Sequence, residues 1–307
     1  MAKNWPLTRR KETLRGRSTI IQEIRRFFIK EGYLEVDTPL RIPAPAPESY
    51  IEAIPSGRWF LHTSPELCMK RMLAAGYERI FQICRCWRDG ERGIRHLPEF
   101  TMLEWYRIDA DYRDLMSECE ALIRSVIHVL GHGGSIRYQG MAVEINEPWE
   151  KLTVSEAFIR YNGMTMAEAL ETDQFDEIMV RDIEPRLGFG KPTFIYDYPA
   201  ERGALARISK DNPAVAERFE LYIGGLELAN AFSELTDAQE QRDRFVQEST
   251  FRASMNRATY PLPEKFLDEL SDMPPSAGIA LGVDRLVMVL LDLSSIDDVV
   301  AFTPEEL

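Results

Sequence analysis

Residues 85–107, RCWRDGERGIRHLPEFTMLEWYR, carry five arginines, although the 307-residue chain has a formal net charge of −13. Arg88 closes a strand-like run, and Arg92, Arg95 and His96 follow on the polar turn after it. A guanidinium group binds phosphate oxygens in a bidentate manner, so this turn fits a polyanionic ligand. A solvated loop with scattered charges is the alternative that the turn alone leaves open.

The strand-like run after the turn places acids beside aromatic side chains. Side chains alternate across a strand, so Phe100, Met102, Glu104 and Tyr106 share one face of residues 99–107. Phe100 is suited to stacking on a base. Single surface acids are ordinary on an acidic protein, but a face that combines acids with apolar side chains indicates a binding site.

Two later segments add candidate residues. Glu220 and Glu227 are seven positions apart, which places them on opposite faces of an unbroken strand, unless Gly224-Gly225 forms a bulge. A small residue recurs at every second position in Gly278, Ala280 and Gly282. The resulting bare strand face would let a ligand approach the backbone, and close packing of sheet and helix is the alternative.

Periodicity and turn signals predict the elements that must position these residues. Apolar residues at helical spacing predict helices over 15–31, 65–75, 112–130 and 286–293. A capping box at Thr153 and Glu156 predicts the start of another helix. Residues 160–190 are expected to be mostly helical. Alternation predicts strands over 33–40, 77–87, 98–107, 194–199, 219–230 and 278–283, and a short hairpin over 136–145. Successive strands are often joined by hairpins. The sequence therefore predicts an α+β fold, a mainly antiparallel sheet flanked by helices.

Composition excludes several classes of protein. No apolar run is long enough for a transmembrane span or a signal peptide, and an isoelectric point near 5.0 argues against non-specific binding to nucleic acid. The four cysteines, Cys68, Cys84, Cys86 and Cys119, form no C-x-x-C pair and have no histidine at zinc-ligand spacing. We expect reduced thiols in a cytoplasmic protein.

Four ordered motifs give the chain a resemblance to the class II aminoacyl-tRNA synthetases of the lysyl type. The hairpin 81–107 resembles motif 2, GYLEVDTPL (32–40) motif 1, LHTSPELCMKRML (61–73) the lysine-pocket segment, and GIALGVDRLVMVLL (278–291) motif 3. Residues 219–241 are similar to the lysyl-type strand that precedes motif 3. The resemblance covers residues 15–305 and implies the class II catalytic fold.

The resemblance implies that ATP activates an amino-acid carboxylate as an aminoacyl-adenylate. Arg88 and Arg285 would be the catalytic residues and would bind ATP together with Arg95, His96 and Phe100. Glu220 and Glu227 would hold Mg²⁺. The residues that would bind a lysine-type substrate are Glu66, Glu104, Tyr106, Asn230, Phe232, Glu234 and Ala280. Several carboxylates at one site select a substrate with two ammonium groups.

The motif 1 helix begins near residue 15, which leaves no room for an N-terminal OB-fold that reads an anticodon. We therefore expect a single catalytic domain over 1–307, similar to the small lysyl-type paralogs that modify elongation factor P. Ala280 is typical of those paralogs, which attach (R)-β-lysine to a lysine side chain of that factor. The resemblance also implies a homodimer, with tRNA unlikely as a partner and no membrane association.

Some positions depart from the family pattern. Asp89, Gly90, Leu97 and Ala231 replace the usual residues, and Arg95 is closer to the tRNA enzymes. Two alternatives therefore stay open: a truncated tRNA synthetase or free adenylate-forming enzyme, and a non-catalytic, ligand-sensing paralog. The presence of Arg88 and Arg285 counts against the non-catalytic alternative.

Overall fold

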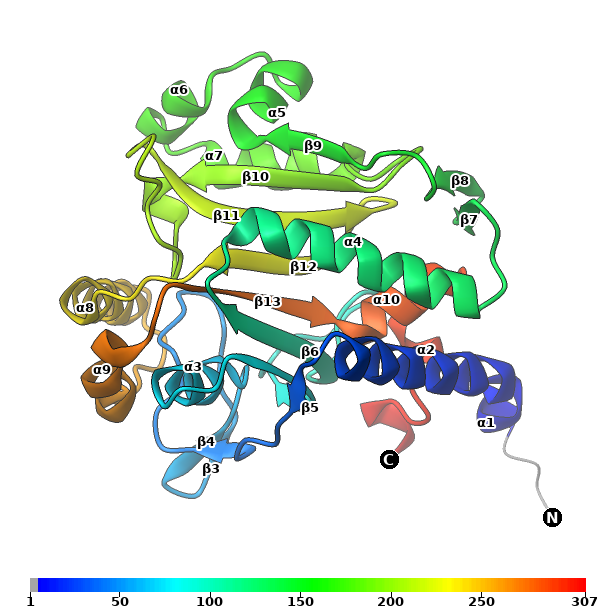
Figure 1. Cartoon of the computed structure of the whole chain (residues 1–307), viewed down its shortest axis with the longest axis horizontal. Coiled ribbons are helices and arrows are strands. Elements are labelled where there is room, and N and C mark those ends of the chain that lie inside the picture. The colour runs from blue at the N-terminus through cyan, green and yellow to red at the C-terminus, as the bar shows by residue number, and fades with distance from the viewer. Residues whose placement is uncertain (1–4) are drawn as a thin grey trace.

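A computed structural model describes residues 5–307. Its main sheet has eight strands in the order β1-β5-β6-β13-β12-β11-β10-β9 (Figure 1). The five inner joins are antiparallel, and the two outermost joins, β1 with β5 and β9 with β10, are parallel. The expected α+β fold with a mainly antiparallel sheet is confirmed.

The main sheet contains β1 (Leu34–Glu35), β5 (Arg79–Trp87), β6 (Glu99–Ile108), β9 (Glu150–Thr153), β10 (Thr193–Pro199), β11 (Val215–Ile223), β12 (Leu226–Ser233) and β13 (Ser276–Gly282). Two smaller sheets contain β2 (Arg41–Ile42), β3 (Pro55–Ser56) and β4 (Trp59–Leu61), and β7 (Ser135–Tyr138) and β8 (Met141–Glu144). The α-helices are α1 (Trp5–Arg9), α2 (Lys11–Lys30), α3 (Glu66–Ala74), α4 (Tyr112–Val129), α5 (Val154–Tyr161), α6 (Met166–Glu171), α7 (Phe175–Ile178), α8 (Ala238–Ser254), α9 (Glu264–Glu269) and α10 (Val283–Leu290).

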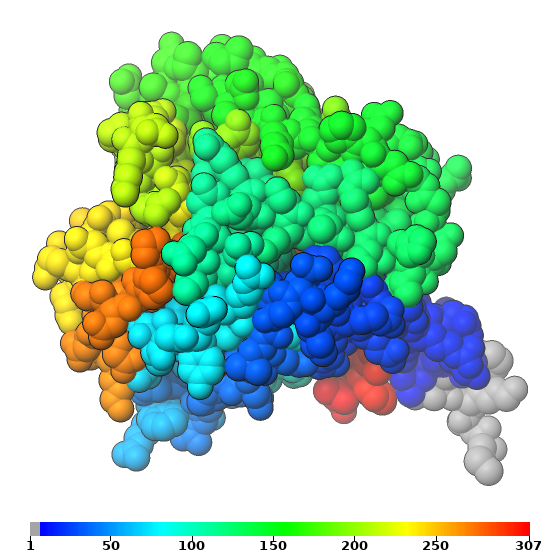
Figure 2. Space-filling model, in the orientation of Figure 1, coloured from blue at the N-terminus to red at the C-terminus, as the bar shows by residue number. Residues whose placement is uncertain are grey.

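Helices α2, α4 and α10 bury the largest core against one face of the sheet. Leu103 and Trp105 of β6 point into this core, as alternation along the strand requires. The apolar stripe of α2, with Ile20, Ile24 and Phe28, is fully buried there, so it packs on the chain's own core. Figure 2 shows this face closed by α2 and α4.

A second core on the opposite face is built by α3, α8 and α9 around Tyr106. A third core joins α5 and α7 to β10 at the other edge of the sheet. Because Tyr106 and Trp105 are consecutive in β6, the two faces of this strand belong to different cores. The sheet face opposite α2 and α4 is the one that carries the residues singled out by the sequence.

Two strand predictions were wrong in detail. Residues 219–230 are not one bulged strand, because Gly224 and Gly225 have φ angles of 61° and 72° and form the two-residue turn of a β11–β12 hairpin. Residues 33–40 pair with β5 only at Leu34–Glu35. The backbone N–H of Thr38 instead donates to the Gln82 side chain, and Pro39 has no N–H to continue a ladder.

Several local predictions were confirmed. Gly32 ends α2 with a φ of 80°, and the capping box of Thr153 and Glu156 opens α5. Residues 160–190, which the sequence left mixed, contain α6, α7 and a π-helical turn at Met179–Ile183. Within residues 5–307, no helix is both long and apolar enough to span a membrane.

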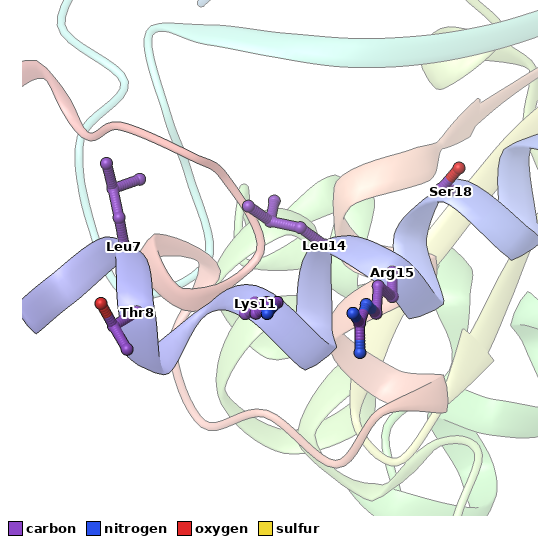
Figure 3. A pocket seen from close by; sticks show the side chains of 6 residues that line it. All are labelled: Leu7, Thr8, Lys11, Leu14, Arg15 and Ser18. Atoms are coloured by element: carbon purple, nitrogen blue, oxygen red, sulfur yellow. The ribbon is translucent and has the colours of Figure 1, made fainter.

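An open groove follows α1 and α2 on the helix-covered side. Its lining residues are Leu7, Thr8, Lys11, Leu14, Arg15 and Ser18 (Figure 3). None of the site residues predicted from the sequence lines this groove. The groove is therefore separate from the predicted site residues.

Candidate active site

Four strands align predicted site residues in one row on the sheet face opposite α2. Glu104 of β6 is paired with Ala280 of β13, Ala280 with Asn230 of β12, and Asn230 with Glu220 of β11. Paired residues in adjacent strands point to the same face. A residue expected to bind Mg²⁺ and three expected to bind the amino acid therefore share one face.

The neighbouring row contains Tyr106, Gly278, Phe232 and Arg218. It explains why position 278 of β13 is a glycine, because a Cβ there would lie 2.1 Å from the Tyr106 ring and 2.5 Å from a carboxylate oxygen of Glu234. At this position the space is taken by the chain's own side chains. The bare position is therefore filled from within the sheet, and not by a helix packed against it.

Three carboxylates and one ammonium group gather around Tyr106, and we call Glu66, Glu104, Glu234 and Lys70 the acid cluster. Glu104 is 1% exposed and accepts hydrogen bonds from the Ser64 hydroxyl at 2.6 Å and the Tyr106 hydroxyl at 2.8 Å. Burial, reinforced by the charge of Glu66, raises the pKa of Glu104 to about 8.

Lys70 is a member of the acid cluster that the sequence analysis missed. It is 1% exposed, and its Nζ lies 2.5 Å from carboxylate oxygens of both Glu66 and Glu234 and 5.0 Å from the centre of the Phe232 ring. Burial disfavours its charged form, but the two carboxylates outweigh that effect and raise the pKa of Lys70. Its position one helical turn after Glu66 was the available signal.

The arginines converge at the other end of the same face. The Arg88 guanidinium stacks on the Phe100 ring, 5.1 Å from its centre. Arg285, in the first turn of α10, contacts the His96 Nε2 at 2.6 Å and donates to the Glu227 carboxylate at 3.2 Å. Burial and the charge of Arg285 lower the pKa of His96, which keeps its ring neutral and able to accept this hydrogen bond.

Arg95 lies at the margin of this group. Its exposed side chain donates to the Gly225 carbonyl at 3.2 Å. Arg95 and His96 also line an open groove together with Ile94, Tyr138, Gln139, Met288 and Ser294. The groove extends the arginine end of the face toward solvent.

Three carboxylates lie near one another beside Arg285. Glu220 accepts hydrogen bonds from Tyr198 at 2.7 Å, Tyr222 at 2.9 Å and Arg218 at 2.7 Å. Glu184, which the sequence did not single out, joins Glu220 and Glu227. Burial and the repulsion of these two acids raise the pKa of Glu184 to about 7.

Two departures from the family pattern have structural explanations. Gly90 has a φ of 74°, which glycine adopts without strain, and the next residue, Glu91, approaches Arg88 at 3.9 Å. Leu97 is buried in the main core beneath the sheet. Neither residue displaces Arg88 or Arg285 from the face.

Comparison with known proteins agrees with this geometry. The family model described as tRNA synthetases class II (D, K and N) matches residues 6–306. A Salmonella gallinarum protein named elongation factor P–(R)-β-lysine ligase is 40% identical over 304 residues, covering 94% of this chain and 93% of its own. Proteins of the same name from Salmonella paratyphi B and Salmonella heidelberg are each 39% identical over 305 residues, with the same coverage. The chain therefore belongs to the class II tRNA synthetase family of ATP-dependent ligases, as its motifs indicated.

Proposed function

We propose that the protein uses ATP to activate a lysine-type amino acid, (R)-β-lysine first among them, and transfers it to a lysine side chain of elongation factor P. The observation that carries this proposal is the acid cluster, placed on the same sheet face as the stacked Arg88 and the half-buried Arg285. Buried acids fit a substrate with two ammonium groups, and paired arginines fit a triphosphate.

The first step joins two negatively charged groups. A carboxylate oxygen of the amino acid attacks the α-phosphorus of ATP, and pyrophosphate leaves. Arg88 would neutralise charge on the attacking carboxylate and the α-phosphate, while Phe100 would stack on the adenine. Arg285 would hold the outer phosphate, with Arg95 and His96 beside it. Preorganised donors of this kind stabilise the charge that develops in the transition state.

The acidic residues beside Arg285 fit a hard divalent cation. Glu184, Glu220 and Glu227 offer oxygen ligands whose mutual repulsion a cation would relieve, as the raised pKa of Glu184 indicates. When bound, Mg²⁺ would neutralise phosphate charge. We propose that Glu220 and Glu227 hold it and that Glu184 supports them.

In the second step, the amine of the acceptor lysine attacks the acyl carbon of the adenylate, and AMP leaves. The names of the three relatives support elongation factor P as the acceptor. We further propose a single catalytic domain that acts as a homodimer. The unpaired cysteines support a reducing compartment such as the cytoplasm.

The first test is ATP–pyrophosphate exchange with lysine and with (R)-β-lysine. We expect exchange with at least one of them. Elongation factor P or tRNA is then added, and we expect the mass of elongation factor P to increase by one acyl residue. Charging of tRNA instead would favour the truncated synthetase, and diamino-acid binding without exchange would favour the non-catalytic paralog.

A further inference from the structure

Two thiols and an imidazole meet beneath the candidate active site. His62, Cys84 and Cys86, which we call the thiol–imidazole cluster, are 1%, 9% and 0% exposed. The two Sγ atoms are 3.9 Å apart, and Cys86 Sγ is 3.9 Å from His62 Nε2. One ligand atom from each residue lies within 4.8 Å of the others.

These separations suit one tetrahedral metal ion. With zinc–sulfur and zinc–nitrogen bonds of about 2.3 and 2.0 Å, a tetrahedral ion holds two sulfurs about 3.8 Å apart and a sulfur and a nitrogen about 3.5 Å apart. The cysteines are two positions apart on one face of β5, and the backbone N–H of Trp87 donates to the His62 carbonyl at 3.1 Å. The backbone therefore already holds the three ligands side by side, and the His62 ring has to turn toward the sulfurs.

A disulfide is the competing outcome for two close thiols. An extended strand rises about 3.3 Å per residue, which places the Cβ atoms of positions 84 and 86 about 6.6 Å apart. A disulfide needs a Cβ separation of about 3.5–4.5 Å. Oxidation would therefore require β5 to bend in the middle of its ladder, whereas a bridging metal accepts the observed geometry.

Charge and ligand softness favour a thiophilic cation. Two thiolates and one divalent ion are neutral together, so binding leaves no net charge buried. His62 Nε2 lies 2.6 Å from the Arg85 carbonyl oxygen. To bind a metal it would give up this hydrogen bond, and the proton would move to Nδ1 so that the ring stays neutral. The Met102 side chain packs against both cysteines.

We propose that His62, Cys84 and Cys86 bind one thiophilic divalent cation of the Zn²⁺ class. The cluster faces the substrate side, because Cys86 is paired with Phe100 and Cys84 with Met102. Cys86 also lies two residues before Arg88 on the same side of the chain. If the proposed function holds, an ion bound here disturbs the positions of Phe100 and Arg88 and inhibits adenylate formation.

The test is titration of the full, reduced, metal-free chain with Co²⁺, followed by displacement with Zn²⁺. We expect one Co²⁺ per chain and a thiolate-to-cobalt charge-transfer absorption in the near-ultraviolet, which Zn²⁺ abolishes. Cys86→Ser should weaken Zn²⁺ binding ~100-fold or more. His62→Gln serves as the second variant in case Cys86→Ser fails to fold. Cys119→Ser is the matched control, because Cys119 is a buried thiol in the α4 core.

Absence of the charge-transfer band in the reduced wild-type chain would overturn the proposal, as would equal loss of the band in Cys119→Ser. Zn²⁺ inhibition of pyrophosphate exchange that disappears in Cys86→Ser would support it further. If pyrophosphate exchange fails in the Zn²⁺-free wild-type chain supplied with Mg²⁺, this counts against the proposed function alone, because metal binding at the thiol–imidazole cluster is read from the spectrum.

Discussion

At the scale of single residues, Lys70 sets the charge balance of the acid cluster. When a cationic ligand keeps Glu66, Glu104 and Glu234 ionised, they carry three negative charges, and the buried ammonium of Lys70 neutralises one. Two carboxylates then remain for a ligand with two ammonium groups. Unpaired buried charge is costly, and a substrate with a single ammonium group would leave one buried carboxylate without an opposite charge.

Replacing Glu234 with Gln tests this balance. We expect the KM for the diamino acid to rise ~10–100-fold, because a charge-assisted hydrogen bond is lost, while the KM for ATP stays unchanged. The measurement is pyrophosphate exchange at varied concentrations of each substrate. Glu99→Gln, at an exposed position of β6, is the control. Equal losses for both substrates would assign Glu234 a structural role.

Replacing Arg88 with Ala tests the other end of the face. Loss of a transition-state donor should lower the rate of adenylation ~10²–10³-fold. Arg85→Ala is the matched control, since Arg85 is exposed and lies on the opposite side of β5. A rate for Arg88→Ala equal to that of the control would remove Arg88 from catalysis.

At the scale of elements, the pairing of β6, β13, β12 and β11 assembles the site. No single strand contains the whole site. If the pairing of one strand shifted by one residue, the site residues of that strand would point into the core on the opposite face. Gly278 shows how closely the rows are packed. The Tyr106 ring and the Glu234 carboxylate occupy the space that a larger residue would need.

Gly278→Ala should therefore destabilise the fold by ~1–3 kcal/mol, because the added methyl group displaces the Tyr106 ring or the Glu234 carboxylate. It should also raise the KM for the diamino acid. Gly282→Ala is a control in the same strand, since its Cβ would meet Arg285 at an ordinary 3.8 Å. Chemical denaturation of both variants checks the expectation, and equal stabilities would contradict it.

At the scale of the whole molecule, the sheet separates a closed helical face from a face where buried acids accumulate. Burial raises the pKa of Glu104 to about 8 and those of Glu48 and Glu184 to about 7. In the folded chain these carboxyls keep protons that the unfolded chain releases near pH 4.5. Protonation of these carboxyl groups therefore stabilises the folded state of the free protein.

We expect the free energy of unfolding to fall as the pH rises from about 5 to about 8, because the folded state binds more protons than the unfolded state across this window. Each group contributes a slope of at most about 1.4 kcal/mol per pH unit. Urea denaturation at several pH values measures the slope, and Glu104→Gln should reduce it. Stability that rises across this window would contradict the role of the buried acids.

Much of the fold and most of the candidate residues could be predicted from local patterns. Alternation in 99–107 separated Trp105 from Tyr106, and Gly32 marked the end of α2. The four motifs identified the family, which the comparisons confirmed. The roles of the individual site residues remain predictions for the experiments above.

The sequence by itself determined which side chains share a face of one strand, because alternation is a property of the local chain. Only the tertiary structure decided which strands meet and in which register. It turned 219–230 into a hairpin that brings Glu220 and Glu227 together, and it placed Lys70 among the acids. It also brought His62 to Cys84 and Cys86. Register and packing arise between distant segments, so no local spacing encodes these contacts.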